Sequence, residues 1–108
     1  MNNFLNKVEL KGYVGSVALK DIQGKKMARF SVATESAYSG RDGSQIVETV
    51  WHPCIVWESE RNKELEKIQK GKFAHVIGRI RANRYTDGNG VERSTWEVIV
   101  FTVKIEED

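Results

Sequence analysis

The sequence predicts an all-β domain of five strands that close into a small barrel, with one α-helix between the third and fourth strands. Apolar residues alternate with polar ones at the period of two that strands require, through most of the chain. Gly and Asn gather where turns would fall, and the period changes only once, over residues 58–70. A length of 108 residues with 40% apolar residues suits a single domain with one modest core.

The beginning of the chain predicts two strands joined by a turn. Residues 3–15 alternate as a first strand, in which Gly12 and Gly15 mark bends of the kind that a barrel needs at its corners. The chain stays extended to a turn at residues 23–24, and residues 26–34 predict the second strand.

A loop, a third strand and a helix follow. Residues 36–44 are rich in Gly and Ser without apolar periodicity, which predicts a loop. Residues 45–57 predict the third strand, which Pro53 places at an edge or a bulge because proline has no N–H for the ladder. Residues 58–70 are rich in helix formers and predict the helix, with Gly71 just after its end.

The last third of the chain predicts a long hairpin over residues 72–100. Its first strand alternates a small apolar core face, which includes Ile80, with a polar face that carries Arg79, Arg81 and Tyr85.

A dense turn over residues 86–90 joins it to a second strand over about residues 92–105. This order of strands and helix, with bends in the first strand, is typical of the five-stranded OB barrel. Another small barrel or an open α+β sheet is the alternative. We expect the OB domain over residues 1–105 and a short acidic end over residues 106–108.

Composition excludes several classes of function. A single cysteine, Cys54, forms no internal disulfide, and His52 and His75 are too few to complete a metal site with it. No signal peptide or membrane span is found, so we expect a soluble, cytoplasmic protein. No phosphate loop or catalytic triad motif occurs. We expect no enzymatic activity, no metal and no cofactor.

Aromatic and basic residues favour a nucleic-acid surface. The net charge of +2 is small, but residues 70–93 hold six Lys/Arg against two Asp/Glu. Tyr38, Trp51, Trp57 and Tyr85 are interleaved with these cations along the chain. Single-stranded nucleic acid requires this combination, because aromatic rings stack bases while cations follow the phosphates. The alternative is that the aromatics belong to the core, which is the place we expect for Trp96.

The chain resembles the bacterial single-stranded-DNA-binding proteins, usually abbreviated SSB. The resemblance runs through most of its length: residues 6–12 (NKVELKG), 30–36 (FSVATES), 49–52 (TVWH), 70–71 (KG) and 84–87 (RYTD). Each motif is short, but their order and spacing together are specific.

The resemblance implies which residues bind DNA. Base stacking falls on Tyr38 in the loop after the second strand, Trp51 and Trp57 on the third strand, and Tyr85 at the hairpin. Basic positions of the phosphate path match Lys70, Arg81 and Arg84. Lys7 and Lys72 are added on charge alone, and Arg79 because it shares the polar hairpin face.

The resemblance also implies an assembly and a role. Family members are typically homotetramers, and His52 falls at a subunit contact, so a homo-oligomer is expected, with a dimer as the alternative. The implied function is sequence-tolerant binding and protection of single-stranded DNA in replication, recombination and repair, in the nucleoid. Family members usually continue into a flexible tail with an acidic end; the sequence stops at Asp108, so docking of partners through such a tail is doubtful.

Two other functions fit an OB barrel. One is a primosome-type protein that bridges replication partners, and the other is a protein-interaction module that has lost DNA binding. RNA is a weaker alternative ligand, because stacking platforms do not by themselves distinguish the two polymers.

Overall fold

The computed structural model describes residues 2–106 and confirms an all-β, five-stranded closed barrel. The strands are hydrogen-bonded in the order β1-β2-β3-β5-β4, and all pairs are antiparallel except β3 with β5. In chain order the elements are β1 (Val8–Ile22), β2 (Lys25–Ser39), β3 (Gln45–Trp57), the 3-10 turn η1 (Leu65–Lys67), β4 (Phe73–Thr86) and β5 (Glu92–Glu106).

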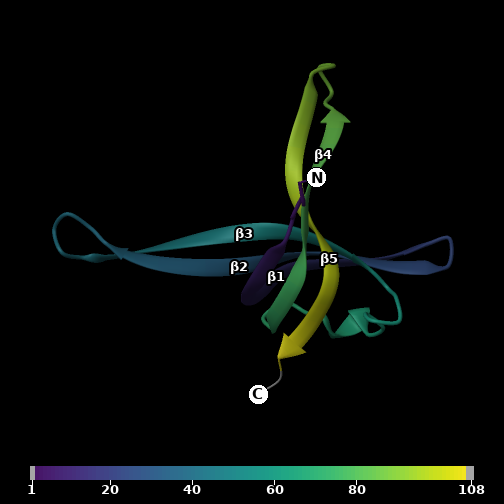
Figure 1. Ribbon diagram of the computed structural model, residues 1–108, viewed down its shortest axis with the longest axis horizontal. Coiled ribbons are helices and arrows are strands. Elements are labelled where there is room, and N and C mark those ends of the chain that lie inside the picture. The colour runs from purple at the N-terminus through teal and green to yellow at the C-terminus, as the bar shows by residue number, and fades with distance from the viewer. Residues whose placement is uncertain (1, 107–108) are drawn as a thin grey trace.

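Three hairpins project from the barrel as two-stranded arms (Figure 1). The β2–β3 arm and the β1–β2 turn point in opposite directions, and the β4–β5 arm stands roughly across them. The arms are long because the hairpin ladders are long while the closing contacts are short. Strand β1 pairs with β4 only over residues 8–13, and β3 pairs with β5 only at Cys54 and Ile55. Beyond these closing contacts, both faces of each arm are left uncovered by the other strands of the barrel.

The core consists of the inward faces of all five strands. Most of its buried side chains are small or β-branched, Met27 and Phe30 being larger, and Leu65 and Ile68 plug one end. The expected bends in β1 are confirmed: a register shift falls between Val14 and Val17, at Gly15. Gly12 has no room for a side chain, because a Cβ there would overlap the carbonyl oxygen of Ala33.

The predicted helix over residues 58–70 is wrong. Only the three-residue turn η1 forms, and the rest of the segment is irregular. The side chain of Asn62 is buried and fastens the segment to β5, accepting a hydrogen bond from Val103 N (3.1 Å) and donating one to Phe101 O (3.0 Å). Helix propensity is a weak preference, and such tertiary contacts override it. Gly71 still takes a positive φ, of 90°.

Other expectations about strand limits and burial are also corrected. Strand β2 continues five residues beyond the predicted end and the loop shrinks to residues 40–44, so Tyr38 lies in a strand and not in a loop. Ile80 and Trp96 were expected to be buried but are both exposed, because they lie on the β4–β5 arm where no other strand covers them. The edge predicted at Pro53 is confirmed: there β3 pairs with β2 and not yet with β5.

Candidate nucleic-acid interface

All four predicted stacking residues are exposed, which contradicts the alternative that they belong to the core. The exposed fraction is 57% for Trp51, 52% for Tyr38, 46% for Tyr85 and 38% for Trp57. Burial of aromatic side chains is a large source of stability, so leaving four of them in water needs a reason other than folding.

Trp51 and Trp57 share the outer face of β3, as the alternation predicts. The register of β3 against β2 is regular from Trp57 to Gln45, so odd-numbered residues keep to one side. The indole of Trp51 lies against β1 at Gly15, where a Cβ would overlap its Cζ3 atom. Trp57 has the ammonium of Lys25 5.7 Å from its ring centroid, a cation–π contact.

A buried carboxylate on β5 joins Arg29 of β2 to Arg81 of β4. Glu97 is 6% exposed and accepts hydrogen bonds from Arg29 on β2 (3.2 Å) and Arg81 on β4 (2.8 Å). Both arginine side chains remain about half exposed. One negative charge thus orients two cations, and the group keeps a net positive charge where a phosphate could approach.

Tyr85 lies near the tip of the same arm, opposite Arg93. Asp87 organises this tip by accepting hydrogen bonds from the backbone N–H groups of Asn89 (2.9 Å) and Val91 (3.0 Å) and from Arg93 Nε (2.6 Å). The hydrogen bond from Arg93, followed by those from the backbone, holds the pKa of Asp87 below its ordinary value. The turn predicted over residues 86–90 is confirmed, with Gly90 at a φ of 78°.

Tyr38 is not brought together with Trp51. Tyr38 pairs with Ile46, whereas Trp51 pairs with Ala33, which lies five positions before Tyr38 in β2. An odd separation places the two rings on opposite faces of the β2–β3 arm, roughly 17 Å apart along the strand. A single strand that contacts both rings must therefore pass around the arm.

The predicted phosphate-path residues are all exposed but fall into separate groups. Lys7 and Arg79 line one hollow on the outer face of β4 and β5. Lys70 and Lys72 flank Gly71, in the loop that is hydrogen-bonded to Val14 (2.8 and 2.9 Å). Val14 is the neighbour of Gly15, against which the Trp51 ring lies. The other two, Arg81 and Arg84, point to opposite faces of the β4–β5 arm, since they are three positions apart.

The predicted subunit-contact residue, His52, is half-buried on the inward-facing side of β3. Its Nε2 lies 2.8 Å from Thr34 Oγ1. With one chain in the structure, its role in assembly stays a prediction. Nearby, burial raises the pKa of the Cys54 thiol to about 12, so this thiol is protonated and unreactive.

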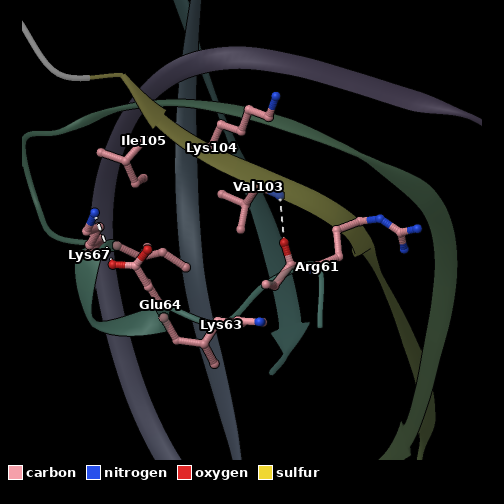
Figure 2. Close-up of a pocket in the computed structure, with 10 residues that line it drawn as sticks. Arg61, Lys63, Glu64, Lys67, Val103, Lys104 and Ile105 are labelled. Atoms are coloured by element: carbon pink, nitrogen blue, oxygen red, sulfur yellow. Dashed lines mark hydrogen bonds and ion pairs between the residues drawn. The ribbon is translucent and has the colours of Figure 1, made fainter. Parts of the chain in front are cut away.

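A cavity of about 440 Å³ lies elsewhere, between the segment around η1 and the end of β5 (Figure 2). None of the predicted site residues lines it. The Lys67–Glu64 ion pair (3.0 Å) and the Asn62–Val103 hydrogen bond join residues of its lining. Among residues 2–106, no group of three or more His, Cys, Asp or Glu could hold a metal, and no helix could cross a membrane.

A closed five-stranded barrel with exposed rings and cations on its outer face defines a binding domain of the OB class. The sequence model described as the single-strand binding protein family matches residues 5–105. The chain belongs to that family.

Similar proteins carry the same description. A single-stranded DNA-binding protein of Neisseria meningitidis serogroup A is 27% identical over 107 residues, which covers 94% of this chain and 59% of the relative. The mitochondrial one of Drosophila melanogaster is 31% identical, covering 92% and 69%. The solved structure of a Plasmodium falciparum SSB in complex with single-stranded DNA matches with a TM-score of 0.85 and 26% identity, covering 99% of this chain and 100% of that one. The chain thus spans about three fifths of the length of the Neisseria relative.

Proposed function

We propose that this protein binds single-stranded DNA without marked sequence preference and protects it during replication, recombination and repair. The observation that carries the proposal is the exposure of four aromatic rings beside cations on the outer face of the barrel and its arms. Exposed rings stack bases of any identity, and lysines and arginines neutralise the phosphates. The family, and the Plasmodium SSB solved with single-stranded DNA, support this ligand over RNA or a protein.

In this proposal Tyr38, Trp51, Trp57 and Tyr85 stack bases, and Lys7, Lys70, Lys72, Arg79, Arg81 and Arg84 contact phosphates. The protein acts by binding alone, in the cytoplasm with the nucleoid, and assembles as a homo-oligomer with His52 at a subunit contact. A tetramer is the expected assembly and a dimer the alternative, and molecular mass in solution distinguishes the two.

The direct test is a fluorescence titration with oligo-dT. Stacking should quench tryptophan emission, and the affinity should fall steeply with salt because bound phosphates release counterions. Trp51→Ala should weaken binding by roughly 5- to 150-fold, the value of one stacked base.

The matched control is Leu19→Ala, which removes a side chain of similar exposure (51%) from the β1–β2 arm and should bind as the parent does. Duplex DNA and RNA of the same length, added as competitors, determine the preferred polymer. Absence of quenching at low salt would exclude single-stranded DNA binding and favour the protein-interaction module.

A further inference from the structure

The two faces of the β4–β5 arm carry different residues, and the proposed site so far uses only one of them for stacking. Directly paired residues of an antiparallel ladder share a face, and successive residues alternate. Tyr85 therefore shares a face with its partner Arg93. Trp96 is paired with Ala82, an odd number of positions from Tyr85, so its indole lies on the reverse face.

Trp96 is the most exposed tryptophan of the protein. Its exposed fraction of 59% exceeds that of each of the four residues proposed to stack bases. Its direct partner, Ala82, is too small to cover an indole, and Ile80 beside it is itself 43% exposed. Within residues 2–106, no aromatic or cation–π contact engages the Trp96 ring. Trp96 and Ile80 together leave a contiguous apolar patch in water, of the kind that marks a binding surface.

Arg84 lies on the same face of the arm as that indole. Arg84 is the diagonal neighbour of Trp96 on the same face, because Arg84 pairs with Ser94 two residues away. Diagonal neighbours are about 7–8 Å apart, within reach of long side chains. Arg84 takes part in no ion pair among the described residues, although Glu92 lines the same hollow of about 260 Å³.

We propose that Trp96 and Arg84 form a second stacking site for single-stranded DNA, on the face of the β4–β5 arm opposite Tyr85. Trp96 stacks a base and Arg84 contacts a phosphate of the same strand, which passes around the arm and uses both of its faces. The inference rests on the proposed function. Continuity selects DNA as the occupant: Arg84 and Tyr85 are consecutive residues, so the two sites are separated only by the thickness of one two-stranded ribbon.

Fluorescence tests this site separately from the main one. In the double variant Trp51→Phe/Trp57→Phe, aromatic rings remain at both positions and Trp96 is the only tryptophan, whose emission is excited selectively over that of the tyrosines. Oligo-dT should quench that emission. Oligomers of about 4 nucleotides should quench it much less than oligomers of about 16, because a strand that fills only the first site does not reach the reverse face.

Substitution at position 96 provides a second readout in the otherwise unchanged chain. Trp96→Phe keeps a ring and should bind a long oligo-dT within about threefold of the parent, whereas Trp96→Leu keeps an apolar surface without a π face and should bind roughly tenfold more weakly. Glu92→Gln removes the carboxylate that lines the same hollow as Arg84 and should strengthen binding at low salt.

The outcomes are distinguishable. If the parent binds and its emission is quenched, but the Trp96 emission of the double variant is unchanged and Trp96→Leu binds as the parent does, the second site is refuted while the proposed function stands. A change of solution mass caused by Trp96→Leu without a change in affinity per subunit would assign the surface to contact with another copy and also refute the proposal. If no chain binds oligo-dT, both fail together.

Discussion

Gly15→Ala should weaken DNA binding without unfolding the barrel. Gly15 lies in β1 beneath the indole of Trp51, and an added methyl group would overlap Cζ3 of that ring and lie 2.8 Å from Ser31 Oγ. The indole is more than half exposed, so it is free to move outward. The backbone of Gly15 does not need a positive φ, so alanine causes no backbone strain there.

The magnitude follows from what Trp51 contributes. One stacked base contributes about 1–3 kcal/mol, or roughly 5- to 150-fold in affinity. Displacement removes part of that, so we expect binding to oligo-dT about 5- to 20-fold weaker. The free energy of unfolding should change little. Alanine reduces the conformational entropy of the unfolded chain, which stabilises the fold by about 0.4–1 kcal/mol and offsets the lost contact between the ring and β1.

The matched control is Gly88→Ala in the hairpin turn, where an added Cβ meets no atom within 4 Å and φ is not positive. The assay is the same oligo-dT titration, with urea unfolding to compare stabilities. In a Trp51→Ala background, Gly15→Ala should have no further effect, because the ring it displaces is absent. Wild-type affinity of Gly15→Ala, or an undiminished effect in that background, would refute the reasoning.

Three further predictions concern stability and chemistry. Asn62→Ala should cost about 1–3 kcal/mol in urea unfolding, because a donor and an acceptor of β5 lose their buried partner. The hydrogen bond from Arg93 holds the pKa of Asp87 below its ordinary 3.8, so the stability that Asp87 gives the hairpin tip is present above pH 3.8 and is lost as pH falls through the lowered pKa. Amide exchange of the turn should accelerate in that low-pH range. In Asp87→Asn the tip is already loosened, so its exchange should show no such pH-dependent step. Cys54, with its pKa raised to about 12, should react with iodoacetamide at pH 8 only at the rate of unfolding; rapid native-state labelling would contradict its burial.

Much of the fold could be predicted because it depends on local pattern. Alternation defines β3 to the residue and β4 to within one residue, and the Gly- and Asn-rich turns fall where they were expected. The helix could not be predicted correctly. Its composition favours a helix, but the decisive contact, from Asn62 to the β5 backbone, joins residues about forty positions apart, and no local pattern reveals such a contact.

Burial of the aromatics was the other question that local pattern left open. Alternation places Trp51 and Trp57 on one face of β3, but the same alternation says nothing about whether a face is covered. Trp96 shows the difficulty, because it alternates with core residues such as Val98 and was assigned to the core with them. It is exposed because the β4–β5 ladder extends beyond the short contact that closes the barrel.

The sequence by itself determined the succession of strands along the chain, the alternation of faces and the set of rings and cations available for binding, since these follow from the period of two and from residue type. Only the tertiary structure decided which of those residues meet. Closure of the barrel brings Glu97 between Arg29 and Arg81, seats Trp51 over Gly15, and leaves both faces of the β4–β5 arm in water. The physical reason is that exposure and ion pairing depend on contacts between strands that are distant in the chain, whereas alternation depends only on neighbours.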